Sequence, residues 1–332
     1  MGIKTIQLEN QSGLAVEIIN IGARITRLMV GGTDVVLGFD TAEEYLPQNH
    51  LSDFGAVIGR YANRLAGGKI CVDGHTIQLP LNNGPNCLHG GPRGWQYALF
   101  DVVSSSHSHV EMRLVSPDGD NGFPGTVTAT VRYTLDGNAL RIDYHAETDS
   151  PTVINMTNHS YFNLDGVMRP ECGTILDHTL QIDADRFTPT DEVNIPLGQH
   201  ISVDNTPFDF RTAKAIGSDI GADDGQLRVG HGYDHNYVLN NPGLSHPAAV
   251  LTSPLTDISL KLFTTAPGLQ LYTGNFLDGG IGKYGSVYPR RSAVCLEAQQ
   301  YPDSPNRHWP ESTGRLLPGH PFDSTTIFQL EK

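Results

Sequence analysis

The chain has 332 residues, a formal net charge of −14 at pH 7, and 36 glycines and 21 prolines. The excess of acidic residues disfavours a nucleic-acid surface and binding to an anionic membrane, because both partners are themselves negative. It also weighs against a doubly charged substrate such as a sugar phosphate, although a local arginine cluster could reverse that. The length allows two domains, but glycine and proline are spread evenly and no linker stands out. We therefore expect one domain over residues 1–332.

The N-terminal residues and the cysteines predict a cytoplasmic location. The opening sequence MGIKTIQLE lacks an apolar stretch of secretory length, and no run approaches the ~20 apolar residues of a membrane helix. The four cysteines, Cys71, Cys87, Cys172 and Cys295, show no metal or redox spacing. This favours core thiols in a reducing compartment over disulfides.

The first elements in chain order are a short helical turn and two hairpins: residues 41–45, residues 69–72 with 76–79, and residues 127–135 with 140–146. In the longer hairpin, apolar and polar side chains alternate on both sides of an Asp-Gly-Asn turn. This period of two, with an Asp-Gly turn between the runs, is typical of paired antiparallel strands.

The next segment, residues 155–164, has the sequence NMTNHSYFNL. As a strand it would place five polar side chains on one face: Asn155, Thr157, His159, Tyr161 and Asn163. The other face would anchor in the core through Ile154, Met156, Phe162 and Leu164. Because asparagine is a poor strand former, its repeated use here implies that these side chains hold a ligand or orient the imidazole.

Later in the chain we expect a helical turn at residues 212–216 and a third strand pair. This pair runs from 258 to 264 and from 269 to 273, around Pro267-Gly268. Strand signals dominate and helical periodicity is scarce. The sequence therefore predicts an all-β fold, a large antiparallel sandwich or barrel with few short helices.

His159 and Glu297 are the strongest candidates for acid–base chemistry. Glu297 is a lone carboxylate in the otherwise apolar run VCLEA, where burial would raise its pKa towards that of a general base working near neutrality. The alternative is a structural ion pair of Glu297 with Arg290 or Arg291. An imidazole and a carboxylate facing a polar pocket could transfer protons on a sugar.

Other polar motifs favour ligand binding over metal or phosphate sites. The run HGYDH at residues 231–235 has histidines at the spacing of a zinc helix, but its glycine indicates a loop or strand entry, which leaves Asp234 as a hydroxyl acceptor. The glycines in GRYANR and LHGG fit no dinucleotide or P-loop spacing. Tight turns that aim Asn63, Arg64 and His89 into a pocket explain them better.

Seven motifs together resemble the aldose 1-epimerase (galactose mutarotase) family, in that family's order and over nearly the whole chain: residues 59–64, 88–91, 155–164, 206–211, 232–239, 268–275 and 297–306. The resemblance implies a large antiparallel β-sandwich of the galactose mutarotase-like type. It implies Glu297 as general base and His159 as general acid. The matching sugar-binding positions are Asn63, Arg64, His89, Tyr161, Asp234 and Gln270.

The implied reaction is the interconversion of α and β anomers of aldohexoses such as galactose and glucose, by acid–base opening and reclosure of the ring. Nothing is oxidised and no nucleophile adds, so we expect no cofactor and no metal. The expected partner is a monosaccharide, with no nucleic acid or membrane, and the chain is expected to be a monomer or homodimer. Which aldose is preferred stays open.

Three rival functions remain from the sequence. A glycoside hydrolase could use Glu297 and Asp234 but would leave His159 without a role. A sugar-binding or sensor protein would not need both His159 and Glu297. A mutarotase for a phosphorylated sugar fits the acidic charge poorly.

Overall fold

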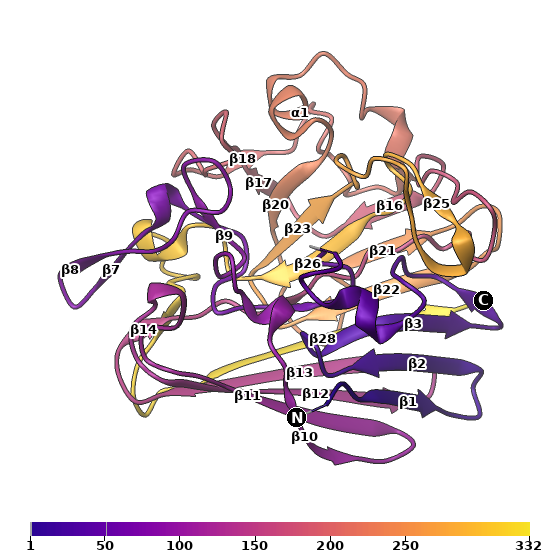
Figure 1. Cartoon of the computed structure of the whole chain (residues 1–332). Coiled ribbons are helices and arrows are strands. Elements are labelled where there is room, and N and C mark those ends of the chain that lie inside the picture. Colours follow the sequence, from indigo (N-terminus) through magenta and orange to yellow (C-terminus); the bar gives the residue numbers. More distant parts are fainter. Residues whose placement is uncertain (1, 51) are drawn as a thin grey trace.

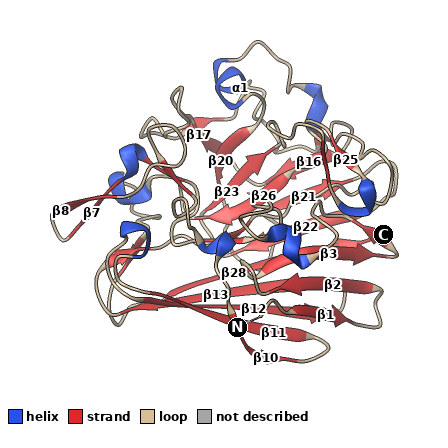
Figure 2. Ribbon diagram, viewed as in Figure 1, coloured by secondary structure: helices blue, strands red, loops and turns tan. Residues whose placement is uncertain are grey.

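The computed structural model describes residues 2–50 and 52–332, and it is built mainly from β-strands, with short helical turns at the periphery (Figures 1 and 2). The largest sheet has nine strands, in the spatial order β10 (Asp101–Ser105), β11 (His109–Ser116), β12 (Val127–Asp136), β13 (Ala139–Thr148), β28 (Phe322–Glu331), β22 (Ser259–Thr264), β21 (Ala249–Thr252), β16 (Thr179–Ile182) and β19 (Lys214–Ala215). A five-stranded sheet has the order β18 (Ile201–Ser202), β17 (Arg186–Thr188), β20 (Asp234–Val238), β23 (Gly268–Tyr272) and β26 (Cys295–Gln299).

The N-terminal strands form a further sheet of β1 (Thr5–Glu9), β2 (Leu14–Ile19), β3 (Arg24–Val30) and β4 (Thr33–Asp34). Short two-stranded ladders pair β5 (Val57–Ile58) with β15 (Thr157–Asn158), β6 (Arg64–Leu65) with β9 (Cys87–Leu88), β7 (Lys69–Val72) with β8 (His75–Gln78), β14 (Thr152–Val153) with β27 (Arg315–Leu316), and β24 (Gly280–Ile281) with β25 (Val287–Tyr288). The helical elements are α1 (Gly225–Gly230) and the 3₁₀ turns η1 (Ala42–Tyr45), η2 (Ala66–Gly68), η3 (Trp95–Tyr97), η4 (Asp120–Gly122), η5 (Ile216–Ser218), η6 (Lys283–Gly285) and η7 (Ser304–Asn306).

The two predicted hairpins and the first helical turn are confirmed. Strands β12 and β13 pair antiparallel from Val127–Thr148 to Asp136–Ala139. Every second side chain of β12 is buried in the core, and the side chains between them are more exposed. Strands β7 and β8 pair around Asp73-Gly74. The turn η1 begins after Thr41, whose backbone N–H donates to the Glu44 carboxylate at 2.8 Å, as in a capping box.

The third predicted strand pair is wrong in its pairing. Both strands exist, as β22 and β23, but β22 pairs with β21 and β28, whereas β23 pairs with β20 and β26. The short connection through Ala266 and Pro267 therefore carries the chain from the nine-stranded to the five-stranded sheet. The predicted helical turn at 212–216 is also wrong, because Lys214–Ala215 is strand β19 and the 3₁₀ turn η5 begins only at Ile216.

The segment 155–164 is not a continuous strand. Only Thr157–Asn158 forms a ladder, with β5, and isolated bridges hold Asn155 and Phe162. The apolar anchors behave as predicted: Ile154, Met156, Phe162 and Leu164 are buried in the main core. The side chains of Asn155 and Asn163 stabilise the irregular backbone by hydrogen bonding to backbone groups.

The main core lies between the sheets, and the five-stranded sheet presents two different faces. Every residue of β20, β23 and β26 is buried. Side chains such as Leu269, Leu271 and Leu296 enter the core. The cross-strand row of Asn236, Gln270 and Glu297 occupies the other face, because partners in an antiparallel ladder share a face. Buried polar groups need partners, so this polar row predicts a functional surface.

The cysteines are free thiols, three of them buried, while Cys71 is exposed and departs from the expectation of core thiols. Within residues 2–50 and 52–332, no helix has the length and apolar character needed to cross a membrane.

Candidate active site

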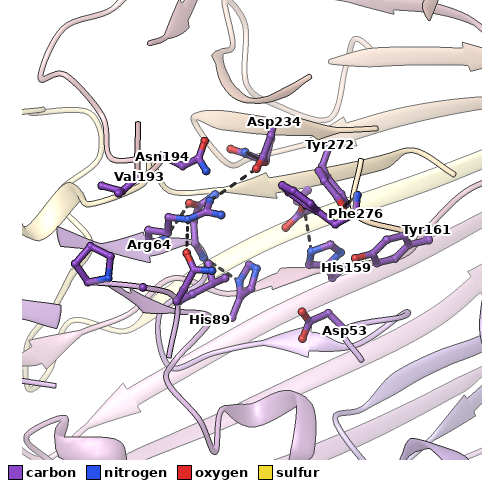
Figure 3. Close-up of a pocket in the computed structure, with 17 residues that line it drawn as sticks. Asp53, Arg64, His89, His159, Tyr161, Val193, Asn194, Asp234, Tyr272 and Phe276 are labelled. Atoms are coloured by element: carbon purple, nitrogen blue, oxygen red, sulfur yellow. Dashed lines mark hydrogen bonds and ion pairs between the residues drawn. The ribbon is translucent and has the colours of Figure 1, made fainter. Parts of the chain in front are cut away.

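A cavity of about 430 Å³ lies over the polar face of β20, β23 and β26 (Figure 3). It is lined by all eight residues predicted for the site: Asn63, Arg64, His89, His159, Tyr161, Asp234, Gln270 and Glu297. The sheet supplies Asp234, Gln270 and Glu297 from three adjacent strands. The other residues come from the short ladders and the segments that flank them: Arg64 is the first residue of β6 and Asn63 precedes it, His89 follows β9, and His159 and Tyr161 follow β15.

His159 and Glu297 are in direct contact. The Nε2 atom of His159 lies 3.5 Å from Oε1 of Glu297, and the two side chains are only 6% and 2% exposed. Burial raises the pKa of Glu297 well above its ordinary value, and the nearby charge of Asp234 adds to this. Burial lowers the pKa of His159, while the charge of Asp53 opposes the decrease in this pKa. These opposite shifts act to reduce the difference between the two ordinary pKa values, which favours proton exchange within the pair.

The structural alternative for Glu297 fails. Arg290 and Arg291 both donate to the backbone carbonyl of His231 instead of pairing with Glu297. The Oε2 atom of Glu297 and the Nδ1 atom of His159 are buried without a hydrogen-bond partner among the described residues. Because buried polar atoms normally have a hydrogen-bond partner, these two atoms are available to bind a ligand.

Asp234 is held in place by its neighbours on the sheet. Gln270 donates from Nε2 to Oδ1 of Asp234 at 2.7 Å, and Gln299 donates from Nε2 to Oε1 of Gln270 at 3.3 Å. Arg64 approaches Oδ2 of Asp234 at 3.9 Å and donates through Nε to Asn83 at 3.0 Å. This network fixes a carboxylate, an amide and a guanidinium at the cavity wall, where they can bind several hydroxyl groups at once.

His89 is held in one tautomer. Its Nδ1 accepts a hydrogen bond from the backbone N–H of Asn63 at 3.2 Å, so the neutral ring carries its proton on Nε2. Burial lowers the pKa of His89 well below its ordinary value, and the charges of His159 and Arg64 act in the same direction. Asn63 and His89 both adopt positive φ, 67° and 52°, and flank the same end of the β6–β9 ladder, next to the Arg64–Leu88 pair. The predicted tight turns therefore do aim these residues into the cavity.

Aromatic rings form the remaining wall. Tyr161 stacks on His159 with ring centroids 4.9 Å apart and planes 12° apart, which fixes the imidazole plane. Tyr272 also lines the cavity and stacks on Phe276, whose side chain is exposed at 58%. A cavity with many hydrogen-bonding groups and a few aromatic faces suits a small polyhydroxylated ligand.

Among the residues that the structure describes, two clusters bring three metal-ligating groups within 4.8 Å of one another: Asp53, His89 and His159, and His159, Cys295 and Glu297. Both are poor metal sites. Nδ1 of His89 is already occupied by the Asn63 amide, and burial raises the pKa of Cys295 well above its ordinary value, which keeps the thiol protonated. Neither cluster includes His231 or His235; His235 is buried, and burial lowers its pKa to about 3.

Comparison with known proteins decides the family. The family model described as aldose 1-epimerase matches residues 4–329. The chain belongs to the aldose 1-epimerase family. It is 42% identical to the galactose mutarotase of Bos taurus, an alignment that covers 99% of this chain and 94% of the relative. It is 40% identical to the aldose 1-epimerase of Escherichia coli strain K12, with 98% and 95% of the two chains covered.

Solved structures of aldose 1-epimerases share the fold. An aldose epimerase homologue from C. elegans superimposes with a TM-score of 0.90 at 31% identity, covering 99% of both chains. The galactose 1-epimerase of Lactobacillus acidophilus NCFM gives a TM-score of 0.86 at 32% identity, covering 99% of this chain and 94% of that one. The predicted fold, a large antiparallel β-sandwich with few short helices, is confirmed.

The prediction that the asparagines of residues 155–164 hold a ligand or orient the imidazole is wrong. Asn155 hydrogen-bonds the backbones of Ala62 and Gln300, and Asn163 donates to the carbonyls of Gly173 and Ser292. They satisfy backbone groups that an irregular segment leaves without a ladder. Of the five polar side chains predicted to share a face, only His159 and Tyr161 line the cavity.

The cavity of this aldose 1-epimerase is also lined by residues that were not predicted from the sequence, among them Asp53, Asn83, Tyr272 and Phe276. Tyr272 could have been found, because it lies two residues from Gln270 on one strand and hence on the same face. Asp53 lies in an irregular segment between η1 and β5, where no period assigns its side chain a direction.

Proposed function

We propose that this aldose 1-epimerase interconverts the α and β anomers of aldohexoses such as galactose and glucose, with Glu297 as general base and His159 as general acid. The observation that carries the proposal is the buried contact between these two titratable groups, 3.5 Å apart, in a cavity lined by hydrogen-bonding side chains. Family membership supports it, because relatives of similar length are galactose mutarotases and an aldose 1-epimerase.

The reaction needs one proton removed and one delivered. Glu297 takes the proton of the C1 hydroxyl while His159, protonated at the start, gives one to the ring oxygen, and the ring opens to an aldehyde. Rotation about the C1–C2 bond exposes the other face, and reclosure reverses the two roles. The cycle returns both side chains to their starting states, so no net proton is exchanged with solvent and no redox cofactor is required.

Asn63, Arg64, His89, Tyr161, Asp234 and Gln270 would orient the remaining hydroxyls. Each such hydrogen bond replaces one to water and is worth only about 0.5–1.5 kcal/mol net. We therefore expect galactose and glucose to bind with dissociation constants nearer millimolar than micromolar, as measured by calorimetry. Submicromolar binding of either sugar would contradict this account of the site.

The pH dependence of the rate should be bell-shaped, because the active pair holds one proton. Burial lowers the pKa of His159 below 6.5, so the second proton binds only in more acidic solution than for an ordinary histidine. Burial raises the pKa of Glu297 well above 4.5, so the pair loses its last proton at a higher pH than an ordinary glutamate would. We expect the acid limb of kcat/KM to lie below pH 6.5. An acid limb above this pH would contradict the assignment.

Polarimetry on freshly dissolved α-D-galactose and α-D-glucose tests the function directly. We expect the protein to accelerate the approach to anomeric equilibrium beyond the spontaneous rate. A folded sample that accelerates neither sugar would overturn the proposed activity. Nitrophenyl glycosides provide a parallel test for hydrolysis, because an anomer-interconverting enzyme releases no phenol.

We also propose a cytoplasmic location, supported by the four free thiols, which fit a reducing compartment. One domain over residues 1–332 and a monomeric or homodimeric assembly stay predictions. Size-exclusion chromatography with light scattering measures the assembly.

A further inference from the structure

Asp53 is a carboxylate of the cavity to which the proposed mechanism gives no role. One of its carboxylate oxygens lies within 4.8 Å of a ring nitrogen of His89 and of a ring nitrogen of His159. Its Oδ1 atom is buried and has no hydrogen-bond partner within residues 2–50 and 52–332. Figure 3 shows Asp53 beside both imidazoles at the cavity. A carboxylate oxygen taken out of water needs a donor, and here the donor must come from whatever fills the cavity.

Asp53 and His89 together fit a hydroxyl group. The Nδ1 atom of His89 is occupied by the Asn63 amide, so the neutral ring offers an N–H at Nε2. A hydroxyl can donate one hydrogen bond and accept others at the same time. It could therefore donate to Asp53 and accept from His89, which would satisfy both side chains.

The chemistry of a pyranose indicates which hydroxyl this is. The ring oxygen is bonded to C1 and C5, and the proposed function places the C1 hydroxyl at Glu297 and the ring oxygen at His159. C5 and its substituent then lie on the side of His159 away from Glu297. Asp53 and Glu297 approach His159 in two separate groups, Asp53 together with His89 and Glu297 together with Cys295, so the two carboxylates occupy different positions around this imidazole. Asp53 thus lies on the side where an aldohexose carries its C6 hydroxymethyl group.

We propose that Asp53 is a specificity-determining residue that binds the C6 hydroxyl of an aldohexose jointly with His89. This inference rests on the proposed function and names the substrate class of that site: neutral aldohexoses with a free primary alcohol. Aldopentoses and 6-deoxyhexoses leave Asp53 and His89 without their shared partner. Uronic acids and hexose 6-phosphates place a second negative charge against Asp53, which is unfavourable in a largely buried site.

Sugars that differ only at C6 provide the test. D-Galactose, its 6-deoxy analogue D-fucose, and L-arabinose, which lacks C6, share the same arrangement of ring hydroxyls. We expect the wild type to use D-fucose and L-arabinose with kcat/KM lower by about 10- to 100-fold than D-galactose, as a lost hydrogen bond to a charged group implies. Asp53→Asn should lower kcat/KM for D-galactose more than for D-fucose and L-arabinose, so that the ratios between the three sugars move towards one; a change in the pKa of His159 would affect all three sugars alike. It should also reduce the discrimination against D-galacturonate.

Asp278→Asn is the matched control. Asp278 is an exposed carboxylate that lines a neighbouring cavity, which Asp53 also borders, but it lies outside the lining of the catalytic cavity. This variant removes the same charge nearby and should leave the ratios between sugars unchanged.

Three results would overturn the inference. The first is a wild type that treats the three sugars alike, which needs no variant and hence no assumption about folding. The second is an Asp53→Asn protein, folded by circular dichroism, that loses activity equally on all three, because Asp53 would then act through the charge of His159. The third is a variant without any change. Failure of the wild type to act on any sugar would instead overturn the proposed function, so the two failures are distinguishable.

Discussion

Glu297→Gln is expected to lower kcat/KM for galactose by about 10²- to 10⁴-fold, the range of a lost general base, which corresponds to about 3–5 kcal/mol of barrier. Glutamine keeps the shape of the side chain but cannot take the proton of the C1 hydroxyl. Polarimetry over the spontaneous rate measures the loss. Near-normal activity in the variant would remove Glu297 as the base.

Unfolding measurements at several pH values test whether the Glu297→Gln variant is folded, so that a loss of activity is not mistaken for a loss of the fold. Because burial raises the pKa of Glu297 above its unfolded value, the folded state favours the protonated form. The stabilising effect of that proton is present below pH 4.5 and is lost as pH rises through the raised pKa. Relative to Glu297→Gln, the wild type should therefore lose unfolding free energy with rising pH. Glu192→Gln, at an exposed position beside the cavity residue Val193, is a matched control that should retain full activity.

Local sequence patterns predicted local structure in this chain and failed where pairing is non-local. The β12–β13 and β7–β8 hairpins have their turn residues and their alternation in one continuous stretch, so sequence alone was sufficient. Strands β22 and β23 have the same appearance, yet they belong to different sheets: β22 pairs with β21 and β28, whereas β23 pairs with β20 and β26. A short connection between two alternating runs is compatible with a hairpin and with a crossing between sheets. Only the packing of the two apolar faces decides between them.

The site residues, too, were predicted correctly only where the local sequence was informative. Glu297 was recognisable because burying a carboxylate in an apolar strand is energetically unfavourable unless it has a function or a partner. His159 was recognisable because it lies in a cluster of polar residues. The asparagines at 155 and 163 gave the same polar signal but serve the backbone, since side-chain amides satisfy carbonyls and N–H groups as readily as sugar hydroxyls. Asp53 gave no signal, because the sequence around it has no period, and only the fold brings it beside His89 and His159.

His159→Asn is expected to lower kcat/KM for galactose by about 10²- to 10⁴-fold, because asparagine cannot deliver a proton to the ring oxygen. The exposed His320→Asn serves as a control and should be fully active. The double variant with Glu297→Gln is the sharper measurement. The two side chains are in contact and act in the same ring-opening step, so the loss in the double variant should be far smaller than the product of the single losses. Losses that multiply would instead mean that His159 and Glu297 act independently, and the paired mechanism would have to be abandoned.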